Sequence, residues 1–388
     1  MKVAFIHDHV FVKNNNQIYT TGGLPASAWD LYINKANQIK VFGRLGNGVA
    51  NTLSSHYNVD FKFSNHYKHP IDYFLKKRSI NTELEKFLFA CDAAILRLPS
   101  TLGLQAQKIC QSKKIPYAIE VVGNAYEALY HYGNIQGKLI ANYFQQKNKK
   151  AIAIAPYAIY VTQNYLQKQY PCNNITSYAS NVQIEISEEN LEKRLLKISQ
   201  DSKMATCLTI GNVNVKYKGY STMLEAMKYL NDKFDMNNII YQIAGSGDFS
   251  NLEKEIKKLN LDGKVQYLGK KNREEIFDLL DRIDLYIHPS YTEGLPRSVV
   301  EAMSRACPCL TSNVGGIPEL IDEEFMHNPK DYKKLAIDLK KMIESKELQS
   351  KSAKQNFIKA KEYEKEKLIK TKIEFWQTFF NSVNKDNV

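Results

Sequence analysis

The sequence predicts an α/β protein with two doubly wound domains, each built on a parallel sheet. The chain has 388 residues, which is too many for one ordinary core and suits two domains of roughly 180 residues each. Short apolar, branched segments also alternate with helix-periodic segments along its length. Strands that are separated by helices form parallel sheets with both faces covered.

The first domain is expected over residues 1–185. It begins with a buried strand at 2–6, a polar loop that runs to Gly23, and a helix from Ala26. Further strands are expected at 39–42, 93–96, 117–122 and 157–161. Helical or irregular stretches separate these strands, as in a parallel sheet.

The second domain is expected over residues 203–370. It follows a charged segment, 184–202, which we interpret as a linker because it lacks a clear apolar stripe. Its strands are expected at 205–210, 239–244, 265–268, 285–288 and 309–311, with helices between them. The last segment, 371–388, is rich in aromatic residues, and we expect it to form a helix that packs back on the first domain.

The composition suits a soluble globular protein, and no apolar run reaches the roughly 18 residues of a membrane-spanning helix. The N-terminus lacks the features of a signal peptide, so we expect a cytoplasmic protein. The six cysteines form no disulfide framework. Cys307 and Cys309 are close in sequence, but a lone pair is a weak metal signal and we interpret both as buried thiols. No metal is expected.

The formal net charge of +12 raises the question of an anionic partner. The densest basic segment, 61–78, interleaves cationic and aromatic side chains. Its members are Phe61, Lys62, Phe63, Tyr67, Lys68, Tyr73, Phe74, Lys76, Lys77 and Arg78. No nucleic-acid-binding pattern accompanies it, so no nucleic acid is expected as partner. A solvated basic face and a peripheral contact with anionic lipid on the inner face of the cytoplasmic membrane both remain open.

The segment 290–303 places Glu293 and Glu301 eight residues apart across the expected start of a helix. Pro296 suits that start, because its missing N–H costs nothing there. The free N–H groups of the first turn attract phosphate, and the two carboxylates can accept hydrogen bonds from sugar hydroxyls. A capped surface helix with a solvated glutamate fits the same spacing equally well.

Three other loops are candidates for contact with a phosphorylated ligand. Gly22 and Gly23 follow the first strand, and such glycines let the backbone approach an anion closely. Lys216 and Lys218 lie where a diphosphate leaving group can be neutralised. Gly245 belongs to a glycine-rich turn at the end of a strand, where nucleotides bind in parallel sheets. Ordinary turns and solvated lysines are the alternatives at each loop.

Taken together, these elements resemble the family-4 retaining glycosyltransferases, which have the two-domain GT-B architecture. The resemblance is strong in the second domain. Its matching positions are Gly211, Lys218, Gly219, 244–248, 265–269, 288–290, Glu293, Gly294, 301–303, Pro308 and 314–319. The first domain matches more loosely, through Gly22, Gly23, 97–99 and 122–123. Its segments 97–123, 160–162 and 166–171 resemble a subset that builds bacterial surface polysaccharides.

The resemblance implies two Rossmann-like domains that face a central cleft. It also implies transfer of a sugar from a nucleotide-sugar donor, with the anomeric configuration kept and without a metal. The implied acceptor is a saccharide or a polyprenyl-diphosphate-linked saccharide, in the synthesis of capsule, O-antigen or exopolysaccharide.

By the same resemblance, Glu293 contacts the donor sugar, Glu301 the ribose and Lys218 the diphosphate. The other implied donor-binding positions are Gly22, Gly23, Gly245, Gly294, Leu295, Pro296, Arg297 and Ser298. A retaining front-face reaction needs no protein nucleophile, because the leaving phosphate itself can take the acceptor proton.

The chain departs from the family pattern in two places. Many members have an arginine just after the glycine that corresponds to Gly211, where this chain has Asn212. Lys216 is the candidate to replace it. Many members also have a histidine near the donor in the first domain, where this chain has Asn124. Asn124 and Arg97 are therefore candidates for acceptor or donor contact.

Two other functions compete with this expectation. A nucleotide-sugar epimerase or hydrolase can have the same fold, and a non-catalytic subunit can keep the fold to bind a partner. An epimerase needs no acceptor, so analysis of products without acceptor separates it from a transferase. A scaffold has no chemical reason to keep both glutamates and Lys218.

Overall fold

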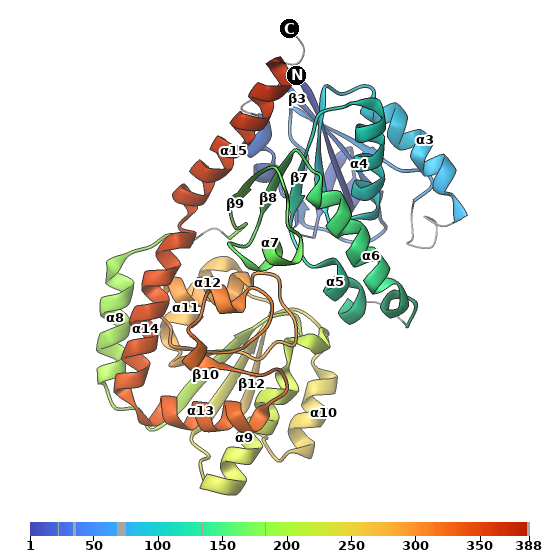
Figure 1. Ribbon diagram of the computed structural model, residues 1–388. Helices are drawn as coiled ribbons and strands as arrows, with labels where there is room; N and C mark the ends of the chain where they lie inside the picture. The colour runs from blue at the N-terminus through green and yellow to red at the C-terminus, as the bar shows by residue number, and fades with distance from the viewer. Residues whose placement is uncertain (22, 34–35, 68–74, 133–134, 183, 386–388) are drawn as a thin grey trace. The chain divides into compact units, whose positions relative to one another are not determined.

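The computed structural model describes residues 1–388 except 22, 34–35, 68–74, 133–134, 183 and 386–388. It divides into two compact units. Unit 1 is Met1–Ala179 with Leu368–Val388, and unit 2 is Ser180–Lys367. Each unit is a sheet with helices around it (Figure 1), so the predicted α/β fold is confirmed.

The central strands of unit 1 are parallel, in the order β5-β3-β1-β6-β7-β8-β9. Strands β2 and β4 extend the far end of β1 in antiparallel pairs. The strands are β1 (Lys2–Asn14), β2 (Gln17–Thr20), β3 (Gln38–Leu45), β4 (Thr52–Leu53), β5 (Val59–Phe63), β6 (Ala93–Leu98), β7 (Tyr117–Val121), β8 (Tyr157–Tyr160) and β9 (Ile175–Tyr178).

The loop expected between the first strand and Gly23 is instead a β-hairpin, so that part of the prediction is wrong. Strand β1 continues to Asn14 and pairs with β2, with Asn14 opposite Gln17. The two residues between them, Asn15 and Asn16, have φ of 45° and 64°. Asparagine tolerates this left-handed conformation better than most residues, and two such residues make the tight turn that matches strand twist.

The two faces of the unit 1 sheet are covered differently. Aliphatic residues such as Ile6, Leu96 and Ile119 pack under α3, α4 and α6. On the other face, the ring of Phe5 lies 5.2 Å from that of Trp29. The helices are α1 (Asp30–Ile33), α3 (Lys77–Leu88), α4 (Thr101–Lys113), α5 (Ala125–Tyr132), α6 (Ile135–Ala153), α7 (Tyr165–Gln169) and most of α15 (Lys365–Lys385).

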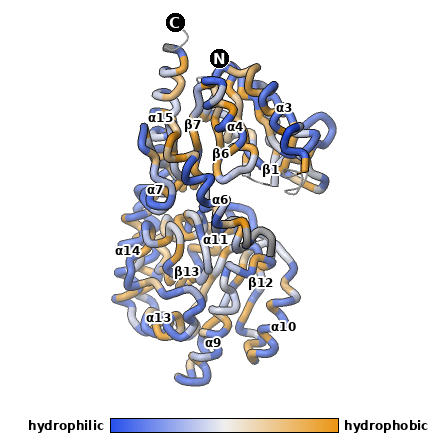
Figure 2. The backbone as a smooth tube through the Cα atoms, turned by 45° about the vertical axis from the view of Figure 1, so that its right-hand side comes forward, coloured by the Kyte–Doolittle hydropathy of each residue, from blue (hydrophilic) through white to orange (hydrophobic). Residues whose placement is uncertain are grey.

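The C-terminal helix α15 supplies further aromatic cover to that second face. The ring of Trp376 lies 5.2 Å from that of Tyr32, and the ring of Phe379 lies 5.3 Å from that of Tyr157. Hydrophobic and hydrophilic residues alternate along α15, as Figure 2 shows. This is the pattern of a helix that buries one face.

Unit 2 has a parallel sheet in the order β12-β11-β10-β13-β14-β15. Its strands are β10 (Ala205–Ile210), β11 (Ile239–Ala244), β12 (Val265–Gly269), β13 (Leu285–His288), β14 (Cys309–Ser312) and β15 (Met326–His327). Numbered within this unit, the order is 3-2-1-4-5-6, that of dinucleotide-binding folds. The order reverses between β10 and β13, which makes the carboxyl ends of these strands the expected ligand site.

Helices lie on both faces of this sheet. They are α8 (Glu188–Ser199), α9 (Tyr220–Phe234), α10 (Ser250–Lys258), α11 (Arg273–Arg282), α12 (Arg297–Ser304), α13 (Tyr332–Glu344) and α14 (Lys346–Ala360). Cys307 and Cys309 are fully buried free thiols, as the sequence suggested.

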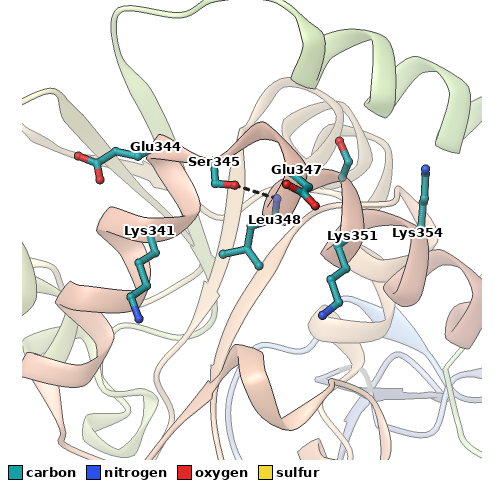
Figure 3. Close-up of a pocket in the computed structure, with 8 residues that line it drawn as sticks. Lys341, Glu344, Ser345, Glu347, Leu348, Lys351 and Lys354 are labelled. Carbon is teal, nitrogen blue, oxygen red and sulfur yellow. Dashed lines mark hydrogen bonds between the residues drawn. The ribbon is translucent and has the colours of Figure 1, made fainter.

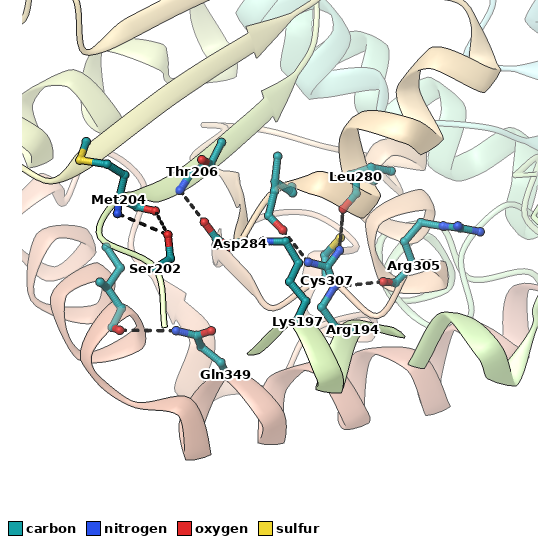
Figure 4. A network of polar contacts seen from close by, with 12 residues as sticks. Arg194, Lys197, Ser202, Met204, Thr206, Leu280, Asp284, Arg305, Cys307 and Gln349 are labelled. Atoms are coloured by element: carbon teal, nitrogen blue, oxygen red, sulfur yellow. Dashed lines mark hydrogen bonds and ion pairs between the residues drawn. The ribbon is translucent and has the colours of Figure 1, made fainter. Parts of the chain in front are cut away.

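The segment interpreted as a linker, 184–202, is in fact occupied mostly by helix α8, and it belongs to unit 2. Arg194 is 3% exposed, and its guanidinium donates to the carbonyls of Leu280 and Ile283, each at 2.5 Å. It also donates to Cys307 Sγ at 3.1 Å (Figure 4). Arginine is therefore a buried anchor of α8, which a search for an apolar stripe overlooks.

We expect Arg194→Leu to lower the free energy of unfolding of unit 2 by about 3 kcal/mol, because it leaves buried carbonyls at the end of α11 without donors. Urea unfolding of the full chain, followed by circular dichroism, measures the change. The control is Lys193→Leu, since Lys193 pairs with Glu189 on the exposed face of α8. Equal stability of the two variants would contradict this role of Arg194.

Candidate functional site

The loops that follow β10 and β13 meet at the carboxyl edge of the unit 2 sheet. Gly219 has φ of +72°, and a Cβ there would lie 1.9 Å from the carbonyl oxygen of Pro289. Gly315 has φ of +56°, and its Cβ would lie 1.6 Å from the carbonyl oxygen of Glu293. No other residue fits either place. Gly219 and Gly315 thus let the loops after β10, β13 and β14 pack backbone against backbone.

Lys218 and Glu293 form a partly buried ion pair at this point. Lys218 closes the short 3-10 turn η2 (Lys216–Lys218), and its Nζ lies 2.6 Å from Glu293 Oε1. The two side chains are 16% and 11% exposed. His288, the last residue of β13, contacts the same oxygen through Nε2 at 2.9 Å. Lys218 and Glu293, two of the predicted site residues, are thus brought together, and His288 contacts the same carboxylate.

Glu293 is charged at neutral pH. Burial alone would raise the pKa of its carboxyl, but the hydrogen bond from His288 and the charge and hydrogen bond of Lys218 outweigh burial and lower the pKa to about 2. Because the pKa of this carboxyl is lower in the folded than in the unfolded chain, its ionised form stabilises the folded state at pH values above the unfolded pKa of 4.5. This contribution is lost as the pH falls toward the folded pKa of about 2. Glu293 therefore only accepts hydrogen bonds.

Both contacts of Glu293 use Oε1, and no residue described in the structure donates to Oε2. The carboxylate thus has one oxygen held by two partners and one oxygen to which none of the described residues donates. This is the arrangement needed to accept hydrogen bonds from the hydroxyls of a ligand.

Helix α12 begins beside this carboxylate. Pro296 is its N-cap and makes no side-chain cap, so the N–H groups of Arg297 and Ser298 have no partner in their own helix. Leu295 and Gly294 precede it in the loop. A helix start of this kind favours an anion.

Glu301 follows one turn further along α12 and is half-buried. Burial raises the pKa of its carboxyl, while the charges of Arg297 and Arg273 lower it. The two carboxylates are held differently. Glu293 is held by Lys218 and His288, whereas Glu301 belongs to helix α12.

Asn212 has a structural role in this structure. Its amide donates to Ser246 Oγ at 3.1 Å, and its Oδ1 accepts from the N–H of Asn214 at 2.9 Å. These bonds join the loop after β10 to the glycine turn that contains Gly245. Lys216 is exposed at the start of η2, and none of the described residues forms an ion pair with it. Asn212 therefore has a structural role in holding two loops together, whereas the Lys216 side chain is exposed.

The candidates in unit 1 lie at the carboxyl ends of β6 and β7. Arg97 is 15% exposed, and its Nε lies 3.8 Å from Glu120 Oε2. Tyr32 donates a short hydrogen bond to the same carboxylate. Asn124 precedes α5, where its Oδ1 accepts from the N–H of Tyr126 at 2.9 Å and its amide donates to Tyr165 at 2.9 Å. Asn124 thus serves as a helix cap.

Gly22 lies outside the described residues, whereas Gly23 packs against a histidine that sequence reasoning missed. A Cβ on Gly23 would lie 2.8 Å from the ring of His9. His9 in turn contacts Thr20 Oγ1 at 2.6 Å. The sequence signal for this histidine was the polar run His7 to His9 next to the apolar start of the first strand. Polar residues of this kind are unusual in a buried central strand.

Surface shape by itself points elsewhere. A depression of about 830 Å³ on unit 2 lies over the junction of α13 and α14 (Figure 3). It is lined by Lys341, Glu344, Ser345, Glu347, Leu348, Ser350, Lys351 and Lys354. None of the predicted site residues borders it, and its charged side chains include members of surface ion pairs, so we place no site there. Within the described residues, no helix is long and apolar enough to cross a membrane.

Comparisons with known proteins identify the family of the chain. Residues 192–359 match the family described as Glycosyl transferases group 1, and this match starts within α8. Protein CapJ of Staphylococcus aureus is 32% identical over 92% of this chain and 90% of its own length. UDP-Gal:alpha-D-GlcNAc-diphosphoundecaprenol alpha-1,3-galactosyltransferase of Escherichia coli is 27% identical over 36% of this chain and 35% of its own length.

Solved structures share the fold at low sequence identity. Sucrose-phosphate synthase of Thermosynechococcus elongatus has a TM-score of 0.69 and 14% identity, over 98% of this chain and 99% of its own. HepE of Anabaena, in complex with UDP and glucose, has a TM-score of 0.64 and 15% identity, over 99% of both chains. The chain therefore belongs to the glycosyl transferases group 1 and is a glycosyltransferase with the GT-B fold.

Proposed function

We propose that this glycosyltransferase moves a sugar from a nucleotide-diphosphate donor to a saccharide acceptor, the lipid-linked precursor of a surface polysaccharide, with retention of the anomeric configuration. The observation that carries the proposal is the half-occupied carboxylate of Glu293 beside Lys218, at the reversal point of the unit 2 sheet. A carboxylate accepts from sugar hydroxyls, and a lysine neutralises phosphate.

Each part of the donor then has a partner. Glu293 Oε2 accepts from hydroxyls of the sugar, and Lys218 together with the α12 N–H groups of Arg297 and Ser298 binds the diphosphate. Glu301, one turn along, accepts from the ribose. The glycine turn at Gly245 bounds the nucleotide side of the same strand edge. The relative HepE, whose structure contains UDP and glucose, makes UDP the first nucleotide to test.

The chemistry proposed here needs no protein nucleophile. The bond between the sugar and the diphosphate breaks, the acceptor oxygen bonds to the same face of the sugar, and the acceptor proton passes to the leaving phosphate. The charge that develops on that phosphate is what the protein must stabilise. In our proposal the ammonium of Lys218 neutralises this negative charge, so no role is assigned to a metal.

We therefore expect turnover to be insensitive to removal of divalent cations. Dialysis against EDTA, followed by assay with and without added Mg²⁺ or Mn²⁺, should change the rate by less than about 2-fold, because a lysine can do the neutralising otherwise done by a metal. A rate that is lost with EDTA and restored by one cation would contradict this expectation.

The function is tested by incubating the chain with radiolabelled nucleotide sugars and membrane-extracted lipid-linked saccharides. Transfer that depends on both substrates is the expected result. Loss of the nucleotide from the donor, or a change in the sugar, without any acceptor would instead identify a hydrolase or an epimerase. Folded protein that binds no nucleotide and gives no product across a complete panel would favour a partner-binding subunit.

The acceptor class is supported by the relatives. The name of the Escherichia coli relative gives a diphosphoundecaprenol-linked sugar as its acceptor. That name is consistent with an acceptor carried on a polyprenyl diphosphate, which would place the enzyme at the inner face of the cytoplasmic membrane.

A cationic surface on unit 1 fits such a location. Lys77, Lys108 and Lys147 project from α3, α4 and α6. The pKa of Lys108 is lowered by burial and by the charges of Lys147 and Lys77, so these like charges lie near one another. Residues 135–153 contain no aspartate or glutamate, and Tyr143 is 64% exposed with Lys147 Nζ 5.1 Å from its ring centre. Anionic lipid headgroups would neutralise the repulsion among these three lysines, and the membrane interface is a favourable environment for the ring of Tyr143.

Of the basic segment singled out in the sequence, Lys68, Tyr73 and Phe74 lie outside the described residues. Lys77 belongs both to that segment and to the lysine surface of α3, α4 and α6, and this surface is the one to test. We expect K77E/K108E/K147E to abolish flotation with vesicles containing phosphatidylglycerol, since each cation near the surface contributes about 1 kcal/mol. The control is K254E/K257E/K258E on α10. Equal flotation of both triple variants would contradict this surface.

A further inference from the structure

His288 is a buried polar residue for which sequence reasoning gave no role. It ends strand β13, whose other residues, Leu285, Tyr286 and Ile287, are as fully buried as His288 itself. A histidine in such a strand must satisfy both ring nitrogens. Its Nε2 lies 2.9 Å from Glu293 Oε1 and 3.2 Å from Ser290 Oγ, and its Nδ1 lies 3.4 Å from the hydroxyl of Tyr286.

The partners of the ring define its tautomer. Burial lowers the pKa of His288, although the hydrogen bond with Glu293 opposes this, so the ring is neutral at neutral pH. Glu293 is a carboxylate and accepts only, so Nε2 carries the proton and donates it. Nδ1 then accepts from the hydroxyl of Tyr286. A chain of hydrogen bonds thus runs from Tyr286 through His288 to Glu293.

Lys218 and His288 both bind Oε1, but only Lys218 has a second proposed task. When a donor diphosphate enters, two anions compete for the Lys218 ammonium. If Lys218 were the only group that held the carboxylate, Glu293 would be free to follow it or to rotate. The neutral His288 donor cannot be drawn away by phosphate in the same manner, because it is rigid, fully buried and attached to the strand end.

We propose that His288 is a positioning residue, which fixes Glu293 through Oε1 so that Oε2 stays directed to the donor sugar while Lys218 serves the diphosphate. The proposal rests on the proposed function, because it assigns a partner to each end of the Glu293 carboxylate.

Two isosteric substitutions separate a positioning role from a merely structural one. In His288→Gln, the amide nitrogen can take the place of Nε2 and donate to Glu293. In His288→Asn, the side chain is one methylene shorter, so the amide reaches only the place of Nδ1 and the donor to Glu293 is lost. Both variants are polar and smaller than histidine, so their effects on packing are similar.

We expect His288→Asn to lower kcat by about 100-fold, as for a misplacement of about 1 Å in a reacting group. The donor KM should change by less than about 3-fold, since the diphosphate and ribose contacts remain. His288→Gln should recover most of kcat. Equal kcat for the wild type and the Asn variant, or equal losses for Asn and Gln, would overturn the proposal.

The pH profile gives a second readout. The groups that face Glu293 are Lys218 from η2, His288 from β13 and Tyr220 from α9. Without the His288 donor, burial still raises the Glu293 pKa and only Lys218 opposes it. The acid limb of kcat should therefore move to higher pH in His288→Asn and stay near its wild-type position in His288→Gln.

The matched control is His327→Asn, a buried histidine on β15 that has no contact with Glu293. It should leave kcat and the acid limb unchanged. Thermal shift with UDP, run on every variant, confirms a folded nucleotide site. If the wild type and Glu293→Gln behave as proposed but His288→Asn matches the wild type, only the role of His288 fails. If the wild type transfers no sugar, the proposed function fails first.

Discussion

Glu293→Gln should lower kcat for sugar transfer by about 1000-fold, the upper effect seen when one preorganised electrostatic group is removed from an active site. The substitution keeps the shape of the side chain but removes the charge that fixes it to Lys218 and His288. The amide can also turn its nitrogen toward the sugar, where it would donate instead of accept. Transfer assays with a saturating donor measure the loss.

The control for this experiment is Glu274→Gln, an exposed glutamate near the start of α11. It should retain the wild-type kcat. Thermal shift with UDP should show that Glu293→Gln still binds nucleotide, because the diphosphate and ribose contacts lie on other residues. A Glu293→Gln variant with wild-type kcat would remove this carboxylate from the reaction.

Lys218→Met should lower kcat/KM by a similar factor of about 1000, since it removes the charge that stabilises the leaving diphosphate but keeps an unbranched side chain only one atom shorter. Lys216→Met should lower it by only about 10-fold if Lys216 replaces the absent arginine from its exposed position. The two lysines belong to one short turn, so each variant is the control for the other.

The pattern of the two lysine variants decides the role of Lys216. A wild-type rate for Lys216→Met would remove it from the site and leave Lys218 as the sole lysine of the proposal. Loss of rate in Lys216→Met with a wild-type rate in Lys218→Met would contradict the geometry, in which Lys218 is the lysine next to Glu293.

The resemblance to family-4 glycosyltransferases predicted that Lys218 and Glu293 belong to one donor site, and the structure places their side chains in contact. Both follow strands of a parallel sheet, and the carboxyl ends of such strands share an edge. The start of α12 next to Pro296 was predicted from the sequence itself, because the position of proline in a helix is restricted. That prediction depends on a local backbone rule, which a single sequence expresses directly.

Other features depend on contacts between residues far apart in the chain. The role of Arg194 is invisible until α11 ends beside α8, because an arginine in a charged segment normally faces water. His288 could be recognised as polar in an apolar strand, but its partner is set by the tautomer and by the loop that brings Glu293 back. Asn212 looked like a lost phosphate contact, whereas its amide joins two loops.

The anomeric configuration of the product tests the central claim most directly. With a nucleotide sugar of known configuration and a lipid-linked acceptor, the anomeric proton of the purified product can be assigned by NMR. A product with the configuration of the donor is what transfer across one face of the sugar at Glu293 and Lys218 predicts. A product with the inverted configuration would contradict it.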